Sequence, residues 1–330
     1  MTAADPAQTP QPLEALIDGA PFTAIQAGVV LLCTVVTLVE GVDLNLIPLL
    51  APAIAKAWSI PSVAFGAIFS AGPIGLIIGG FGVGYVADRI GRRPALIGAM
   101  VVMTLATLAT AFARDTTQLM LLRVLTGIGF GGVIPASTAL VCEFLPTRTR
   151  ASVVAFVILG QSLGGLVASL LMKTAVASLS WRTIIFDMAL ACGLATLLLL
   201  AALPESPRYL LLRRPDGPAI AATLRRLRVT RAPAPAAALR VGGGLGQVRE
   251  LFAPGRALGT CLLWAVFIGI CAPVSFFTNW LRLIYTAAGQ PASVGIDAAA
   301  ARTIAISTTF TFQRAQNSGR TRPPAMLPAQ

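Results

Sequence analysis

Long apolar runs alternate along the chain with short connections that carry most of the polar and charged residues. Each run reaches about 20 residues, the length that an α-helix needs to cross a hydrocarbon layer of about 30 Å. Because unpaired backbone groups are costly in lipid, we expect every run to be a helix. The pattern therefore predicts an all-α polytopic membrane protein with seven spans, at residues 24–53, 61–86, 94–113, 118–142, 151–173, 182–203 and 258–281.

The segments between and beyond these runs predict the domain organisation. We expect a cytoplasmic amino-terminal tail (1–22), a six-helix bundle (23–203), a partly helical cytoplasmic linker (204–257) and a seventh helix (258–281). Such a linker suggests a second bundle, yet residues 282–330 are polar and contain no further apolar run of spanning length. We expect this tail to be disordered or frameshifted, so that the architecture is cut short. A natural short form, a frameshifted reading frame and an artificial boundary all stay open.

Composition supports a membrane protein and argues against other classes. Of the 330 residues, 56% are hydrophobic and 12% are charged, and the mean hydropathy is +0.80, too apolar for an ordinary soluble domain. The chain has no histidine, and its five cysteines lack the paired spacing of a metal site. No nucleophile and base pair is recognisable, so we do not expect an enzyme. The first twenty residues lack a signal-peptide pattern, so the first run should stay as an anchor.

The distribution of basic residues predicts an orientation in the membrane. The formal net charge is +12, but the arginines gather in the connections between spans, so no nucleic-acid partner is expected. The connections after the second, fourth and sixth spans contain three, two and ten arginines. The opposite side holds only Lys56, Arg114, Lys173 and Arg182. Because basic residues concentrate on the cytoplasmic side, we expect a cytoplasmic amino terminus.

The turn after the second span combines glycines with charges, in GGFGVGYVADRIGRRP at residues 79–94. The glycines in this segment and just before it, namely Gly75, Gly79, Gly80 and Gly84, should allow close helix approach, and the cations can meet helix carboxyl ends or acids on neighbouring loops. Orientation of the spans by basic residues alone is the simpler alternative. The turn resembles the signature G-x-x-x-D-R-x-G-R-R of the major facilitator superfamily, matched by Gly84, Asp88, Arg89, Gly91, Arg92 and Arg93. The resemblance implies that superfamily's amino-terminal six-helix bundle, followed here by a seventh helix.

Two further segments resemble the same superfamily. LLRVLTGIGFGGVIPASTALVCEFLPTRTRA resembles its fourth helix and includes Arg123, Glu143 and Arg150. PESPRYLL resembles the motif after its sixth helix and includes Glu205 and Arg208. In both segments an acid and an arginine flank a short turn at the cytoplasmic face, where several ion pairs together could latch that side shut. We therefore predict a gate made of the 84–93 turn and these two segments, with solvated loop charges as the alternative.

Two acids interrupt the first apolar run, in VVTLVEGVDLNLIPLL at residues 35–50. Glu40 and Asp43 are three residues apart, so they share a helix face and would repel each other if both were ionised and unpaired. One of them should carry a proton or find a cation. Ionisable groups inside a membrane are costly and usually mark a substrate or proton pathway. The alternative is that both acids lie in the outer headgroup region at a helix end.

A basic residue of the fourth span reaches a similar depth. At the helical rise, Glu40 lies about 24 Å along the first span and about 6 Å from the outer boundary. Arg123 lies about 7 to 8 Å into the fourth span, which enters the membrane from outside. If the two spans are neighbours, the acids and Arg123 occupy one layer and form a charge site.

The acids also resemble a more specific pattern. EGVD at residues 40–43, with Pro48 downstream, is similar to the first-helix signature D-G-x-D of the aromatic acid/proton symporter family. Glu40 replaces the usual first Asp and could move the carboxyl group by roughly 1.5 Å. LLWAVFIGICAPVSFFTNWL resembles that family's seventh helix, although Arg282 stands where a proline usually follows NWL. The resemblance extends over about residues 20–285.

This resemblance implies a proton-coupled symporter of aromatic carboxylates, of the benzoate or hydroxybenzoate type, in a bacterial inner membrane. In such a carrier, which works by alternating access, Arg123 would attract the substrate carboxylate. Asp43 or Glu40 would bind and release the coupling proton. No cofactor is expected beyond the proton as coupling ion, and the expected partners are a small organic anion and the lipid bilayer.

Two other functions stay open. A sugar or other organic-solute carrier is one, because PESPRYLL and the spacing of Glu143 and Arg150 resemble sugar porters too. A truncated remnant that does not transport is the other, because carriers of this superfamily bind cargo between two six-helix halves. This chain supplies one half and a single further helix. Self-association of two copies could complete such a cavity.

Overall fold

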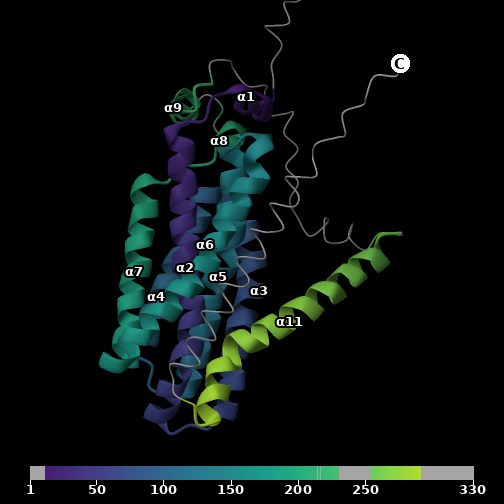
Figure 1. Cartoon of the computed structure of the whole chain (residues 1–330). Helices are drawn as coiled ribbons and strands as arrows, with labels where there is room; N and C mark the ends of the chain where they lie inside the picture. The colour runs from purple at the N-terminus through teal and green to yellow at the C-terminus, as the bar shows by residue number, and fades with distance from the viewer. Residues whose placement is uncertain (1–11, 214, 216, 230–252, 254, 291–330) are drawn as a thin grey trace, which may run out of the picture.

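The computed structural model describes residues 12–229, apart from 214 and 216, and residues 253–290, apart from 254. All regular structure in these residues is helical (Figure 1). Seven of the helices are long and apolar enough to cross a membrane, which confirms the predicted all-α polytopic fold. In chain order the elements are α1 (Leu13–Gly19), α2 (Ala24–Trp58), the 3₁₀ turn η2 (Ser62–Ala64), α3 (Phe65–Ile90), α4 (Arg92–Thr110), α5 (Thr116–Phe144), α6 (Thr147–Ser178), α7 (Trp181–Ala202), α8 (Pro207–Arg213), α9 (Pro218–Arg226) and α11 (Ala257–Ala287).

Each predicted span is found, although several boundaries move. α2 continues through Pro48 and Pro52 to Trp58, even though each proline removes one backbone hydrogen bond from the helix. α11 continues to Ala287 because Arg282 and Leu283 are buried against the bundle. The prediction of a polar tail from residue 282 is therefore wrong for residues 282–287. The expected disorder or frameshift beyond residue 290 lies outside the described residues, as do residues 230–252 of the predicted linker.

The six helices α2 to α7 pack as one bundle, chiefly α2 with α6, α3 with α5, and α4 with α5 and α7. Glycines bring the backbones of α3 and α5 together, as small residues do in membrane helices. A Cβ added at Gly75 would overlap the carbonyl oxygen of Val124, and one added at Gly127 would overlap that of Gly72. A Cβ added at Gly84 would meet no atom within 4 Å, so the expected role of Gly84 in close helix approach is wrong.

Three short helices gather at one end of the bundle (Figure 1). α1, α8 and α9 share a small apolar cluster formed by Leu13, Ile17, Leu210, Leu211 and Ile220. Asp18 of α1 accepts hydrogen bonds from the hydroxyl (2.7 Å) and the backbone N–H (2.6 Å) of Thr147, the first residue of α6. These two hydrogen bonds lower the pKa of Asp18. α1 is thus attached to α6 at the end where the arginine-rich connections lie.

α11 contacts the bundle mainly through its carboxyl-terminal half, and its other half leans away (Figure 1). Trp280 meets the ring of Phe69 edge to face at 5.5 Å between centroids, and the Arg282 guanidinium donates to the carbonyl oxygen of Leu49. Towards the amino end of the helix, Leu263 and Phe267 are 70% and 68% exposed. An apolar surface of this kind suits a helix that faces lipid.

Candidate functional site

The three charged side chains of the predicted site are buried inside the bundle. Glu40 and Asp43 lie near the middle of α2, and Arg123 lies in the first third of α5. Their exposed fractions are 1%, 2% and 7%. Because α2 and α5 are in contact, these side chains occupy the interior of one bundle. The position of both acids near the middle of a 35-residue helix argues against the alternative in which they lie at a helix end in the outer headgroup region.

Asp43 accepts a hydrogen bond from α4 and is attracted to the charge of Arg123. The buried Thr107 hydroxyl donates to Asp43 Oδ2 over 2.9 Å. Asp43 and Arg123 attract each other electrostatically, but no ion pair within 4.0 Å includes Arg123 among the described residues. The guanidinium lies near the ring of Phe130, with 5.8 Å between Cζ and the ring centroid. Its fork of N–H donors can therefore accommodate a further anion.

Glu40 has one hydrogen-bond donor for its two carboxyl oxygens. Gln161 Nε2 of α6 donates to Glu40 Oε1 over 3.3 Å, whereas the buried Oε2 has no hydrogen-bond partner in the described part of the chain. Gly41 allows this contact, because a Cβ at that position would overlap the backbone carbonyl oxygen of Gln161. The glycine between the two acids therefore brings α6 close enough for its amide side chain to reach Glu40.

Thr107 and Gln161 are site residues to which the sequence alone assigned no role. Both lie inside predicted spans, at 94–113 and 151–173. Gln161 lies among Gly160, Gly164 and Gly165, which is compatible with a polar contact in a cavity, but close helix packing explains these glycines equally well. A threonine in a helix commonly bonds to its own backbone, so Thr107 carried no distinguishing signal.

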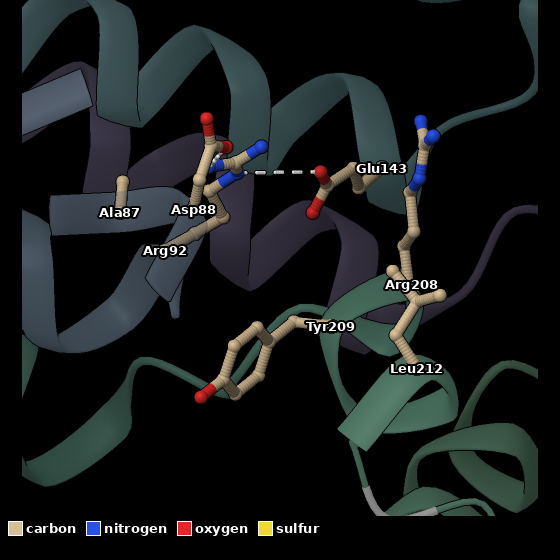
Figure 2. Close-up of a pocket in the computed structure, with 7 residues that line it drawn as sticks. All are labelled: Ala87, Asp88, Arg92, Glu143, Arg208, Tyr209 and Leu212. Atoms are coloured by element: carbon tan, nitrogen blue, oxygen red, sulfur yellow. Dashed lines mark hydrogen bonds and ion pairs between the residues drawn. The ribbon is translucent and has the colours of Figure 1, made fainter. Parts of the chain in front are cut away.

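The predicted gate residues meet at the end of the bundle that carries α1, α8 and α9. Arg92 forms ion pairs with Asp88, at 2.5 Å, and with Glu143, at 3.4 Å between Nε and Oε1. Figure 2 shows these three side chains beside a cavity of about 120 Å³, which Arg208, Tyr209 and Leu212 line from α8. One arginine thus connects the start of α4 with the ends of α3 and α5.

Glu205, in the connection between α7 and α8, caps the amino end of α4. The backbone N–H groups of Arg92 and Arg93 each donate to Glu205 Oε1 over 3.1 Å. A carboxylate at a helix amino end is favourable because it meets unpaired N–H groups and the positive end of the helix dipole. Glu205 therefore serves as a cap, a role that its predicted pairing with Arg208 did not include.

The other predicted gate residues make contacts of a different kind. Arg150 Nε donates to the carbonyl oxygen of Leu145 over 2.9 Å, so the described part of the chain does not contain the expected ion pair between Glu143 and Arg150. Arg89 lies 4.2 Å from the centroid of the Tyr85 ring. Arg93 Nη2 donates to a carbonyl oxygen at the end of α7, that of Leu200, over 2.7 Å. Arg89, Arg93 and Arg150 therefore contact a ring or backbone carbonyl oxygens, whereas Arg92 pairs with two acids.

No group of three His, Cys, Asp or Glu side chains that could hold a metal ion is found within the described ranges. The buried layer itself contains two carboxyl groups, an amide, a hydroxyl and a guanidinium. Such groups can bind an anion and take up or release a proton.

Comparison with known proteins places this arrangement in a family. The family model described as Major Facilitator Superfamily matches residues 32–325, and so extends beyond residue 285, where the resemblance was expected to stop. The gallate transporter of Pseudomonas putida is 32% identical over 282 residues, which are 84% of this chain and 62% of that protein. The 4-hydroxybenzoate transporter PcaK of the same organism is 30% identical over 288 residues, which are 84% of this chain and 63% of that protein.

The chain therefore spans less than two thirds of the length of these curated relatives. Both relatives are named as transporters, in agreement with the prediction that the chain is not an enzyme. Among solved structures, the xylose transporter XylE from E. coli in a partially occluded, inward-open conformation superposes with a TM-score of 0.64. That match has 19% identity and covers 91% of this chain and 74% of XylE, so it supports the fold and not the cargo.

Proposed function

Because this chain belongs to the major facilitator superfamily, we propose that it acts as a proton-coupled symporter of aromatic carboxylates, by alternating access. The proposed location is a bacterial inner membrane, with the amino terminus in the cytoplasm. The relatives named for gallate and 4-hydroxybenzoate support this class of cargo. The observation that carries the proposal is the buried layer in which Asp43 and Arg123 attract each other without forming a close ion pair.

In this proposal Arg123 binds the substrate carboxylate, and an acid of α2 binds the coupling proton. A guanidinium forms bidentate hydrogen bonds with a carboxylate, and the low dielectric of a buried site strengthens the attraction. Protonation of an acid in the layer removes a negative charge that competes with the substrate for Arg123. One proton and one anion then cross together without net charge, and each favours the binding of the other.

The gate in this proposal is the contact network around Arg92. Separation of α4 from α3 and α5 at that end requires loss of the ion pairs of Arg92 to Asp88 and Glu143. Separation of α4 from the start of α8 requires loss of the Glu205 cap. Partly exposed ion pairs contribute only about 0–1 kcal/mol each. The network can consequently keep the gate closed, while substrate binding can still shift the equilibrium between the closed and open states.

Uptake into membrane vesicles tests the proposal. Vesicles that contain the chain should accumulate labelled 4-hydroxybenzoate when the outside is acidified, and a protonophore should abolish the accumulation. Arg123→Ala and Asp43→Asn should each reduce initial uptake roughly tenfold to a hundredfold, because a charge-assisted hydrogen bond contributes about 1.5–3 kcal/mol.

Matched control variants distinguish the loss of a site residue from a general effect of removing a charge. Arg114→Ala and Asp187→Asn remove the same kinds of charge at exposed positions and should retain wild-type uptake. Uptake by Arg123→Ala or Asp43→Asn at the wild-type rate would reject the assigned roles. A competition panel decides between cargo classes: inhibition by sugars and not by aromatic acids would replace this proposal with a sugar carrier.

A further inference from the structure

We infer that the two acids of α2 have different tasks: Glu40 carries the proton, and Asp43 stays a carboxylate. Gln161 and Thr107 are the positioning residues that set this division. The inference rests on the proposed symport, for which either acid would otherwise serve equally well. It is supported by the unequal surroundings of two carboxyl groups that are both almost completely buried.

Asp43 has the partners that a carboxylate needs. An ionised carboxyl group only accepts hydrogen bonds, and the Thr107 hydroxyl donates to Oδ2 over 2.9 Å. The positive charge of Arg123 acts on the same group. A buried charge that is both hydrogen-bonded and near an opposite charge can persist inside a bundle.

Glu40 lacks those partners. The contact from Gln161 is long, at 3.3 Å, and Oε2 is buried with no hydrogen-bond partner in the described part of the chain. The nearby charge that acts on Glu40 is the negative one of Asp43. An ionised Glu40 would thus be desolvated, incompletely hydrogen-bonded and repelled by its neighbour. In the neutral acid, Oε1 is the carbonyl oxygen that accepts from the Gln161 amide, and Oε2 carries the proton.

The groups on the surrounding helices also differ in how they act on Glu40 and on Asp43. Gln161, the residue of α6 that reaches Glu40, is neutral. From α7, Cys192 lies near enough for the charge of Asp43 to act on its thiol, which is not a cation. From α5, Arg123 acts on Asp43. From α11, Arg282 donates to the Leu49 carbonyl oxygen, further along α2. The cationic group that acts on the acid pair from these helices therefore favours the ionised form of Asp43.

The division gives the coupling a specific route. A proton from the outer solution binds Oε2 of Glu40, and the layer then contains one negative charge, on Asp43, beside Arg123. The substrate anion can approach the guanidinium under these conditions. When the proton leaves Oε2 towards the cytoplasm, the second negative charge repels the anion and favours its release. Gln161 acts on this route by orienting the acid that carries the proton.

Infrared difference spectroscopy of the purified chain in lipid tests the inference without requiring transport. A protonated carboxyl group has a C=O stretching band that a carboxylate lacks. We expect a band at neutral pH that is lost in Glu40→Gln and retained in Asp43→Asn. Gln161→Leu should move this band to higher frequency, because the carbonyl loses its hydrogen-bond donor, and Gln161→Asn should leave it intermediate.

The hydroxyl on α4 provides the second arm of the experiment. Thr107→Val should add a protonated-acid band from Asp43 at a pH where Asp43 of the wild type contributes none. Thr107→Ser, which keeps a hydroxyl, should lack this added band. Thr104→Val is the control, since it deletes a hydroxyl from the same helix that bonds to Met100 and Thr196 instead. Thermal unfolding of each variant identifies any that fail to fold.

Two results would overturn the inference. One is a neutral-pH band that disappears in Asp43→Asn and survives in Glu40→Gln. The other is a wild type with no protonated carboxyl band that depends on Glu40. Failure of the wild type to accumulate aromatic acids would instead reject the symport, and the spectra would still decide which acid holds a proton.

Discussion

Gly91 has a backbone conformation that residues with a side chain rarely adopt. Its φ is +111°, and a Cβ at this position would lie 2.5 Å from Glu205 Oε2. The carboxylate that would be displaced is the one that caps α4. Loss of the cap would leave the backbone N–H groups of Arg92 and Arg93 without their acceptor. A side chain at position 91 would therefore cause both backbone strain and loss of the α4 cap.

Gly91→Ala should consequently destabilise the protein by about 1–3 kcal/mol. Thermal unfolding in detergent measures this as a lower Tm. Gly84→Ala is the matched control, because an added Cβ there meets no atom within 4 Å, and it should leave the Tm nearly unchanged. Equal unfolding temperatures for Gly91→Ala and the wild type would show that the gate end does not depend on this contact.

At the residue scale, the sequence predicted which charged residues form the buried site, but it did not predict their hydrogen-bond partners. The spacing of Glu40 and Asp43 placed them on one helix face, and both are buried with Arg123. Their partners Thr107 and Gln161 come from helices whose rotation about their own axes is set by packing. For the same reason spacing along the chain suggested that Glu143 pairs with Arg150, whereas helix packing brings Arg92 to Glu143.

At the scale of elements, α1 is attached to the bundle by a contact that depends on pH. Asp18 accepts two hydrogen bonds from Thr147, and these lower its pKa below the ordinary value. A carboxyl group with a lowered pKa stabilises the folded arrangement fully above the unfolded pKa of about 3.9. That stabilisation is lost as the pH falls through the lower, folded value.

Hydrogen exchange in the first turn of α6 measures this attachment. In the wild type, exchange there should stay slow at neutral pH and become faster only in acid, below the ordinary pKa of an aspartate. Asp18→Ala should make exchange fast at neutral pH and remove its dependence on acid. Glu14→Gln, on the same helix, should behave like the wild type. An acid dependence that persists in Asp18→Ala would assign the attachment to the apolar cluster alone.

Element boundaries were predictable where apolar runs end in polar residues, and less so where packing extends a helix. The existence of all seven spanning helices followed from run length. The extension of α11 to Ala287 did not, because Arg282 is a charged residue that local sequence places outside a span. Its burial against α2 is a tertiary contact, through the carbonyl oxygen of Leu49.

At the scale of the whole molecule, the described residues form one six-helix bundle with one additional spanning helix. The chain spans about 62% of the length of the gallate transporter. Superfamily membership was predictable from short motifs, because the spacing of glycines, acids and arginines in the turns between spans can be read directly from the sequence. Whether this chain alone encloses a cargo site depends on contacts between bundles, which motifs within one bundle cannot predict.

Binding and mass measurements on the detergent-purified chain test whether two copies are needed to form a cargo site. If the chain transports by self-association, a dimer should be the species that binds labelled 4-hydroxybenzoate, and Arg123→Ala should weaken that binding roughly tenfold to a hundredfold. Arg114→Ala should bind as the wild type does. A strictly monomeric chain with no measurable binding would instead identify a remnant that does not transport.

α4 is in contact with both the gate residue Glu205 and the buried acid Asp43. The first residue of α4, Arg92, donates its backbone N–H to Glu205, and Thr107 of the same helix donates to Asp43 about 22 Å further along the axis. A helix resists compression along its length, so sliding of α4 changes both contacts together. An axial displacement that lengthens the Glu205 contact therefore also shifts the Thr107 hydroxyl relative to Asp43. The stiffness of α4 alone can therefore couple the contact at Glu205 to the contact at Asp43.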